Sequence, residues 1–488
     1  MKYLILIILS IISTIVLGQE DLNKVNREVT QAQIKAHLEF LASDALRGRN
    51  TGSQGLEAAA AYLASHFRSA GINEVDSSYF QVVPFVTFSP PDSSSLRIGD
   101  ISLEFGNDYI AINGRKDQMT ATTVDVGYGS KDEIEKTDLR FKVAVSIAGD
   151  GISKDPRDWI AESREKRKRV KAAGGVALIE IYQSNAVPWR FLKMLGRQSQ
   201  TTVDEGTENT DLPNLWLGTT DSTIIAALKN GKLPLHLDMD EVERKTFPSA
   251  NVVGMVPGTD STLAKEYIVY SAHYDHVGEG AADDTGDTIY NGARDNAVGT
   301  TAVLSLAKYF AKYPPKRSSI FVLFTAEEKG LLGSKYFTQH LPVETSQIKY
   351  NFNIDNGGYN DTTIISVIGL TRTEAEADIQ SACNMLGLTA IEDPAKEQGL
   401  FDRSDNVNFA VLGIPAPTFS LGFRAFDAEI FKYYHRPGDH VESLNMNYIE
   451  KYVKAYILSA INIANKDVAP FWVEGDKYFE SGVNLYKR

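Results

Sequence analysis

The chain has 488 residues, of which 43% are hydrophobic and 23% charged, a composition typical of a globular protein with room for more than one domain. Its formal net charge of -13 argues against nucleic acid as a partner, because phosphate binding needs a basic surface. The chain has one cysteine, Cys383, which excludes an internal disulfide and a thiolate metal cluster. Any bound metal must therefore have His, Asp and Glu ligands, and we interpret Cys383 as a buried small hydrophobic residue.

The first residues, MKYLILIILSIISTIVLGQE, have the pattern of a signal peptide. A lysine precedes an almost wholly apolar run from Leu4 to Ile12, and small residues lead to a cleavage point before Gln19. We therefore expect residues 1–18 to be removed and the protein to be exported, either periplasmic or secreted. An uncleaved membrane anchor is the alternative. No later stretch has the ~18 apolar residues that a membrane span needs, so we expect no span after cleavage.

The segment between residues 31 and 72 is predicted to form two helices around the glycine-rich loop LASDALRGRNTGSQG. The second helix is the Ala-rich segment 57–70, which Gly71 terminates. Short strands and turns follow from about residue 80 to 112. We assign 19–117 to the first part of the main domain.

Around residue 118 the pattern changes to short strands and one basic helix. The expected elements are strands at 122–126, 142–147 and 176–181 and a helix at 164–173. We interpret residues 118–250 as a separate α/β or β-rich module that is inserted into the main domain.

From Asn251 onward, strands and helices alternate. The expected strands are 267–272, 320–325, 350–354 and 364–368, and the expected helices are 298–310, 331–340 and 447–465. Such alternation predicts an α/β fold with a largely parallel sheet covered by helices on both faces. Functional groups in such sheets gather at the carboxyl ends of the strands. The main domain continues to residue 468, and 469–488 form an aromatic-containing C-terminal tail.

Potential metal ligands stand at the ends of these strands or in the adjoining loops. They are His273, Glu328 and Asp355 directly after strands, Asp295 in a loop that opens a helix, and His435 in a loop with Gly and Pro. Each one alone has an ordinary structural explanation, such as a helix cap at Asp295 or a turn at Asp355. Their common position at one edge of the sheet is what predicts a metal site.

The ligand types indicate which metal the site would hold. Two histidines and three carboxylates suit zinc, with cobalt or manganese as substitutes. Five ligands are too many for one tetrahedral catalytic zinc that keeps an open position. They suit two ions if one carboxylate bridges, with the metals about 3.5–4 Å apart as in many hydrolytic sites. We therefore expect two Zn²⁺ ions.

Several ordered motifs resemble the zinc exopeptidases of peptidase family M28, in clan MH. They are AHYDHVG, NGARDNAVG, FTAEEKGLLGS, NIDNGG and YHRPGDH, together with LASDALRGRNTGSQG and RSDNVNFAVLGIPAPTF, so the resemblance covers most of 31–117 and 251–465. It implies a three-layer α/β/α catalytic domain of the phosphorylase/hydrolase-like type, formed by 19–117 and 251–468. The insert 118–250, with VDVGYG, FKVAVSI and KAAGGVALIEI, resembles a protease-associated (PA) domain.

The resemblance also implies how the ligands are shared. His273 and Asp355 would complete one zinc site, and Glu328 and His435 the other. Asp295 would bridge the two ions.

The resemblance implies further roles beside the metals. Glu327 would be the general base that passes a proton to the leaving amine. Asp275 would hydrogen-bond His273 and fix its tautomer. Tyr433 or Tyr434 would either donate to the oxyanion or pack in the core. The motif gives His276 no metal role.

Two positions depart from the pattern of the family. Arg294 stands where members often carry Asp, and Asn406 stands where they often carry His. Neither is a ligand position, so we expect altered pocket contacts and retained metal.

The expected function is that of an aminopeptidase, a metallo-exopeptidase that removes N-terminal residues from peptides. A carboxypeptidase or dipeptidase of the same fold is the alternative, because an acidic group would capture an α-amine and an arginine an α-carboxylate. Arg403 and Arg424 leave this choice open. A receptor-like homologue without activity is a third alternative, which the intact ligand set disfavours. A metallo-β-lactamase-type site is disfavoured too, since Ser271 occupies its first His position. The oligomeric state is not predicted.

Overall fold

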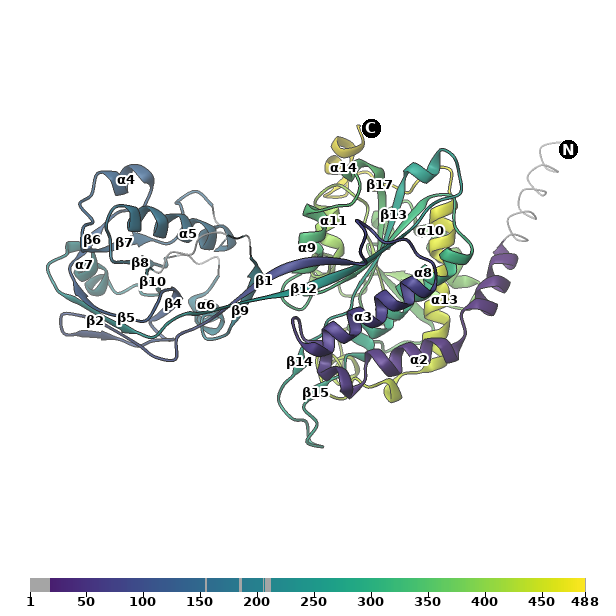
Figure 1. Ribbon diagram of the computed structural model, residues 1–488, viewed down its shortest axis with the longest axis horizontal. Helices are drawn as coiled ribbons and strands as arrows, with labels where there is room; N and C mark the ends of the chain where they lie inside the picture. Colours follow the sequence, from purple (N-terminus) through teal and green to yellow (C-terminus); the bar gives the residue numbers. More distant parts are fainter. Residues whose placement is uncertain (1–17, 154–155, 184–186, 205, 207–211, 488) are drawn as a thin grey trace. The chain divides into compact units, whose positions relative to one another are not determined.

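The structure is a computed structural model that describes residues 18–153, 156–183, 187–204, 206 and 212–487. It divides into two units (Figure 1): a larger one with the described residues of Met1–Val83 and Pro248–Arg488, and a smaller one with those of Pro84–Phe247. Most of the predicted signal peptide, residues 1–17, lies outside the described residues. Among the described helices, none combines the length and apolar character needed to span a membrane.

The larger unit is built on a mixed sheet. Its strands follow the order β19 (Thr389–Glu392), β18 (Ile364–Ile368), β20 (Thr418–Leu421), β17 (Ile348–Ile354), β13 (Tyr267–His273), β16 (Ser318–Phe324), β12 (Glu243–Val256) and β1 (Phe80–Ser89). The central strands β20, β17, β13 and β16 are parallel, whereas β12 runs antiparallel to β16 and β18 runs antiparallel to β20. This arrangement confirms the predicted α/β fold with a largely parallel centre.

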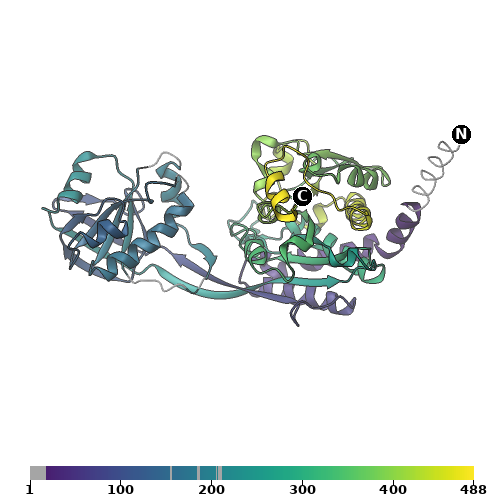
Figure 2. The same ribbon diagram turned by 90° about the horizontal axis from the view of Figure 1, so that it is seen from above.

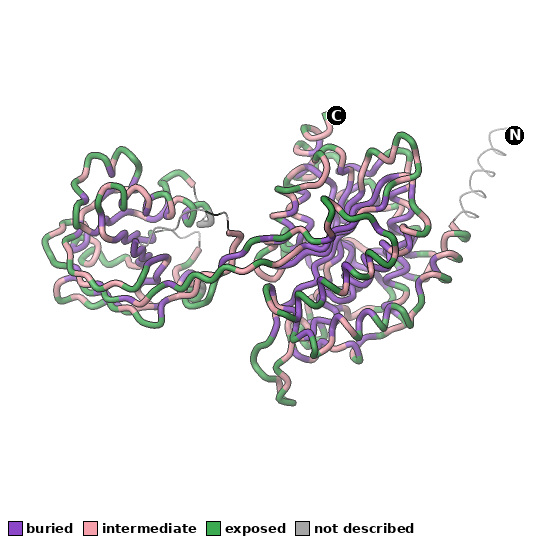
Figure 3. The backbone as a smooth tube through the Cα atoms, viewed as in Figure 1, coloured by how far each residue is buried: buried purple, intermediate pink, exposed green. Residues whose placement is uncertain are grey.

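Side-chain alternation along the strands creates a hydrophobic core on each face of the sheet. On β13, Tyr270 and Ala272 belong to one core and Val269 to the other. The first core is covered by α2 (Gln31–Leu41), α3 (Gln54–Ser69), α8 (Gly299–Lys312), α10 (Glu376–Asn384) and α13 (Met446–Asn465). The second is covered by α9 (Leu332–Gln339), α11 (Asn406–Ala410) and α14 (Phe479–Tyr486). Figure 2 shows the same unit from above, and Figure 3 shows its buried interior. The sheet with helices on both faces forms the expected three-layer α/β/α arrangement.

The helix boundaries reflect capping as well as apolar spacing. Helix α3 begins at Gln54, earlier than the expected residue 57, because the Ser53 hydroxyl accepts a hydrogen bond from the Leu56 amide at 3.2 Å. The chain leaves this helix through Gly71, whose φ of +74° is a left-handed conformation that glycine adopts without strain. Helix α13 begins after Asn445, which caps it in the same way.

The boundary of the smaller unit differs from the expected one. Residues 84–117, expected in the main domain, lie in the smaller unit. They contain β2 (Ser94–Ile98), β3 (Ile101–Leu103) and β4 (Tyr109–Asn113), of which β2 pairs with β11 (Leu235–Met239) and β4 with β10 (Asn214–Leu217). Because these partners are about a hundred or more residues away in the sequence, local pattern gave no sign of the pairing.

The smaller unit has two sheets around a core of its own. One has the order β4, β10, β8 (Ala177–Ile181), β7 (Val143–Ile147), β6 (Thr123–Asp125), and the other β3, β2, β11, β5 (Asp117–Ala121). Its helices are α4 (Lys131–Glu135), α5 (Pro156–Ala172), α6 (Trp189–Leu195) and α7 (Ser222–Asn230), and the short strand β9 (Gln200–Val203) pairs with β1. The expected strands at 122–126, 142–147 and 176–181 correspond to β6, β7 and β8.

The C-terminal tail packs on the larger unit. Trp472 is buried in the second core and donates a hydrogen bond from Nε1 to the Gly413 carbonyl at 2.9 Å. Cys383 is fully buried in the first core, and burial raises the pKa of its thiol to about 12. The interpretation of Cys383 as a buried hydrophobic residue is therefore confirmed.

Candidate metal centre

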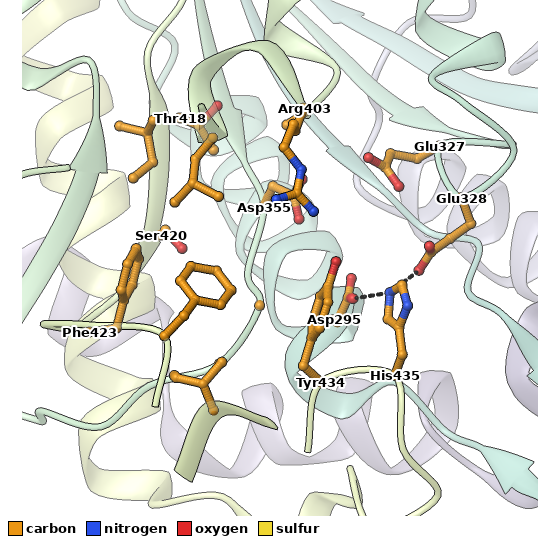
Figure 4. A pocket seen from close by; sticks show the side chains of 17 residues that line it. Asp295, Glu327, Glu328, Asp355, Arg403, Thr418, Ser420, Phe423, Tyr434 and His435 are labelled. Atoms are coloured by element: carbon orange, nitrogen blue, oxygen red, sulfur yellow. Dashed lines mark ion pairs between the residues drawn. The ribbon is translucent and has the colours of Figure 1, made fainter. Parts of the chain in front are cut away.

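The carboxyl ends of three parallel strands meet at one edge of the larger unit's sheet. In the β13–β16 register His273 is opposite Phe324, and in the β13–β17 register Ala272 is opposite Ile354. Residues that directly follow these strands therefore converge, and they include Glu327, Glu328 and Asp355. The predicted ligands come together at this edge, as Figure 4 shows for Asp295, Glu328, Asp355 and His435.

The first group of donors contains His273, Asp295 and Asp355. His273 Nε2 lies 3.3 Å from Asp295 Oδ1 and 3.3 Å from Asp355 Oδ1. His273 is buried, as is Asp295, while Asp355 is half-buried and reaches the pocket. These three residues could hold one metal ion and leave a position open.

The second group contains Asp295, Glu328 and His435, and also His276. His435 Nε2 lies 3.1 Å from Asp295 Oδ2 and 3.2 Å from Glu328 Oε1. His276 Nδ1 lies 2.9 Å from Glu328 Oε1 and 3.9 Å from Asp295 Oδ2. Asp295 thus turns one carboxylate oxygen toward each group, which is the arrangement that a bridging ligand requires.

The distances between the donor atoms fit metal ligation. Two ligands each 2.0–2.1 Å from a tetrahedral zinc ion lie about 3.3 Å apart. The four distances from His273 and His435 to the carboxylates fall between 3.1 and 3.3 Å. The distance from His276 to Glu328, 2.9 Å, is instead a normal hydrogen-bond length. We interpret His276 as a donor that holds Glu328, a contact that sequence reasoning missed.

The charges of the two groups are strongly coupled. Burial lowers the pKa of His435, but hydrogen bonds to Asp295 and Glu328 outweigh it and raise the pKa to about 10. Burial and Asp295 raise the pKa of Glu328, but hydrogen bonds from His276 and His435 prevail and lower it to about 2. Concentrated negative charge of this kind attracts cations, which favours a metal-binding role for the cluster.

Glu327 lies beside the ligands and lines the pocket. Burial raises its pKa well above the usual range; His273 opposes the rise, and Asp355 and Glu328 add to it. Ala326, the residue before it, has a left-handed backbone with φ of 56°. An alanine in this region is strained and marks a tight turn, which here separates Glu327 and Glu328 from the end of β16.

Asp275 contacts His273 as expected, but through its backbone carbonyl. Its carboxylate oxygen Oδ1 lies 3.8 Å from His273 Nδ1, whereas the Asp275 backbone carbonyl lies 3.2 Å from that nitrogen. The carboxylate instead accepts hydrogen bonds from the Glu327 amide at 3.1 Å, the Glu328 amide at 3.4 Å and the Thr51 hydroxyl at 3.1 Å. Asp275 therefore holds the turn that carries both glutamates, and its carbonyl fixes the tautomer of His273.

Arg49, from the N-terminal glycine-rich loop, connects two loops of the site. It is 1% exposed and donates to the carbonyls of Tyr274 at 2.8 Å, Asn291 at 2.7 Å and Gly292 at 3.1 Å, and also to that of Leu41. Burial lowers the pKa of Arg49 to about 10. Sequence reasoning singled out this loop but not its arginine, because the acceptors are backbone atoms that no side-chain pattern reveals.

The two departures from the family pattern do not line the pocket. Arg294 Nη1 donates to Asp439 Oδ1 at 2.8 Å. The Arg294 guanidinium stacks on the Tyr433 ring, with its central carbon 3.7 Å from the ring centroid. The Asp439 carboxylate also accepts from the Asp295 amide at 3.3 Å. Asn406 donates to the backbone carbonyls of Phe401 at 3.1 Å and Ala416 at 3.0 Å. Both residues support loops of the site, rather than altering pocket contacts as expected.

The pocket beside the two groups has one acidic side and one apolar side. The acidic side is formed by Asp295, Glu327, Glu328 and Asp355, and the apolar side by Ile368, Leu400, Phe423, Phe426 and Ile430. Tyr434 and Arg403 also line it (Figure 4). Arg424 does not, and pairs with Asp361 at 2.7 Å.

Comparisons with known proteins match this part of the chain. The model of peptidase family M28 matches residues 251–459, which contain all five predicted ligands. Aminopeptidase YwaD of Bacillus subtilis (strain 168) is 25% identical over 340 residues, covering 68% of this chain and 64% of its own length. An aminopeptidase of Pseudomonas aeruginosa (strain UCBPP-PA14) is 27% identical over 329 residues, covering 65% of this chain and 55% of its own length.

The chain thus spans less than two thirds of the length of these two curated relatives. Among solved structures, an aminopeptidase from Aneurinibacillus sp. strain AM-1 has a TM-score of 0.53 at 21% identity, covering 92% of this chain and 97% of that one. This similarity shows a shared fold. The match to the model of peptidase family M28 covers residues 251–459, so the part of the chain that assembles the donor groups is similar to that family.

Proposed function

We propose that the chain is a two-zinc aminopeptidase that removes residues from the N-terminus of peptides. The observation that carries this proposal is Asp295, whose two carboxylate oxygens face two separate groups of histidine and carboxylate donors beside an open pocket. The match of residues 251–459 to the model of peptidase family M28 and the names of the two relatives support it.

His273, Asp355 and Asp295 would hold one zinc ion, and Glu328, His435 and Asp295 the other. When bound, the ions would polarise the scissile carbonyl and lower the pKa of water in the site. The protein side chains supply the rest of the chemistry. His276 orients Glu328, and the Asp275 carbonyl keeps the Nε2 lone pair of His273 directed at its site.

Glu327 is the proposed general base. Its position between the donor groups and the pocket lets it accept a proton from the attacking water and deliver that proton to the leaving amine. Nearby cations favour its ionised form, which this role requires. Asp275 fixes the turn that presents Glu327.

Tyr434 is the proposed donor to the oxyanion. Its ring stacks on His435 with centroids 4.1 Å apart, and it lines the pocket. Tyr433 lies instead under the Arg294 guanidinium. Of these two tyrosines, Tyr434 is therefore the one whose position supports the proposal.

Carboxylates near the proposed ions favour capture of a substrate's α-amine, which is the basis of the aminopeptidase proposal. Arg403 supports a second candidate, because it also lines the pocket and would pair with an α-carboxylate. A carboxypeptidase or dipeptidase therefore remains the alternative function. Arg424 no longer supports it, since this side chain pairs with Asp361.

The deciding experiment uses the purified protein with aminoacyl-arylamides and with N-blocked peptides, each with and without chelator. We expect chelator-sensitive cleavage of the arylamides and none of the N-blocked peptides. Arg403→Met separates the candidates further: an aminopeptidase keeps its activity on arylamides, whereas a carboxypeptidase loses C-terminal cleavage. Release of C-terminal residues from N-blocked peptides by the wild-type protein would refute the proposal.

We also propose that the protein is exported after cleavage before Gln19, and that the smaller unit is a protease-associated domain. The apolar N-terminal sequence supports the first proposal, and the strand motifs of 118–250 support the second. N-terminal sequencing of protein from fractionated cells tests export directly. A mature chain that still begins at Met1 in the cytoplasmic fraction would overturn it.

A further inference from the structure

The smaller unit contains a cavity of about 380 Å³ that is separate from the metal centre. It lies among β1, β4, α5, α6, β9 and β10, which Figure 1 labels. Its apolar lining includes Phe88, Ile110, Ile112, Leu192 and Trp216. This volume is within the range of small-molecule binding sites, which are mainly apolar with a few polar groups that orient the ligand.

One charged side chain of this cavity is deeply buried. Arg167, on α5, is 6% exposed and lines the cavity. Its Nη1 donates to Asn214 Oδ1 at 3.1 Å, but its buried Nε has no hydrogen-bond partner among the described residues. Burial lowers the pKa of Arg167 to about 10, so the guanidinium is charged at neutral pH.

Glu180, a buried carboxylate close to Arg167, is already paired with another cation. Glu180 is fully buried and forms an ion pair with Lys166 at 2.9 Å. It also accepts hydrogen bonds from Asn214 at 3.2 Å and Trp216 at 3.0 Å, as well as from the Ser163 hydroxyl. With Lys166 and Arg167 on one side and Glu180 on the other, this buried cluster carries one positive charge in excess.

The acidic residue of the cavity lining does not supply the missing charge either. Asp204 accepts two hydrogen bonds from Arg244, each at 2.9 Å. Asp204 is therefore engaged by Arg244 and is not paired with Arg167. A buried charge is normally paired, because removing an ion from water is costly. The cavity therefore has the chemistry of a site for an anion with an apolar body.

We propose that this cavity binds an apolar monocarboxylate, with its carboxylate on the Arg167 guanidinium and its hydrocarbon chain against Ile110, Ile112 and Trp216. Arginine suits this role because its planar N–H groups match the two oxygens of a carboxylate. The proposal is independent of the peptidase chemistry, since Arg167 and the metal ligands belong to different units.

Calorimetric titration of the full-length protein with decanoate and with 1-decanol tests this site. We expect decanoate to bind the wild-type protein and Arg167→Met to weaken that binding at least tenfold, with 1-decanol binding unchanged. Lys171→Met, which removes an exposed cation from the same helix, should leave decanoate binding unchanged. Carboxylate binding at the metal centre would not respond to Arg167→Met, so the two sites are distinguishable.

A second variant keeps the test decisive if Arg167→Met does not fold. Ile112→Phe fills part of the cavity and retains the arginine, and it should weaken both decanoate and 1-decanol. Absence of decanoate binding to the wild-type protein would overturn the proposal. Equal binding by the wild-type protein and Arg167→Met would overturn it as well.

Discussion

Asp439 connects the loop of His435 to Asp295, and replacing it by Asn tests this connection. Asp439 is 1% exposed, and its carboxylate accepts from Arg294 Nη1 at 2.8 Å and from the Arg294 amide at 2.9 Å. The substitution by Asn removes the negative charge and one hydrogen-bond acceptor. Arg294, which is 3% exposed, then stays buried without its counter-charge. Breaking a buried ion pair from one side costs about 3–5 kcal/mol, so we expect Asp439→Asn to lower the free energy of unfolding by this amount.

The matched control is Asp467→Asn, which removes the charge of a surface pair in the same unit. Lys316 and Asp467 are 2.9 Å apart, and the Asp467 side chain is 91% exposed. Surface pairs contribute little, so this variant should unfold like the wild type. Hydrogen exchange, measured at increasing urea concentrations in the presence of a chelator, reports the free energy of unfolding of the larger unit separately from that of the smaller one. Equal losses in the two variants would refute the assignment of a buried, structurally important pair.

Three further predictions concern catalysis, metal affinity and pH. Glu327→Gln should keep its zinc content but lower kcat by several orders of magnitude; near-normal turnover with two bound ions would exclude the general-base role. His276→Ala should weaken zinc binding about 10–100-fold in chelator competition, because Glu328 loses its 2.9 Å donor. Burial lowers the pKa of His37 from 6.5 to about 3. As the pH falls, His37 is therefore protonated in the unfolded chain before it is protonated in the folded one. The larger unit should lose stability as the pH falls from about 6.5 to 3. His37→Gln should reduce this loss in urea titrations, whereas His340→Gln, at an exposed position, should not.

The central strands and the convergence of the candidate ligands could be predicted from sequence because both have local signals. Each strand is a short apolar run, and each ligand interrupts that pattern at the end of a strand or in a loop. The parallel centre of the sheet then brings residues such as Glu328 and Asp355 together by topology alone. The prediction of a common edge needed no knowledge of individual contacts.

The contacts that support the ligands could not be predicted in this way. Arg49 binds backbone carbonyls more than two hundred residues away, and the Arg294–Asp439 pair joins loops 145 residues apart. Asp275 contacts His273 through its backbone carbonyl, while its carboxylate accepts hydrogen bonds from two backbone amides and a hydroxyl, which the sequence did not indicate. The position of residues 84–117 also depends on distant strand partners. All of these features depend on which segments pack together, which local periodicity does not encode.

The most direct test of the two-zinc site is a crystal of the zinc-loaded protein measured on both sides of the zinc absorption edge. We expect two anomalous peaks about 3.5–4 Å apart. One should lie among His273, Asp295 and Asp355, and the other among Asp295, Glu328 and His435. A single peak, or ions that do not share Asp295, would contradict the account.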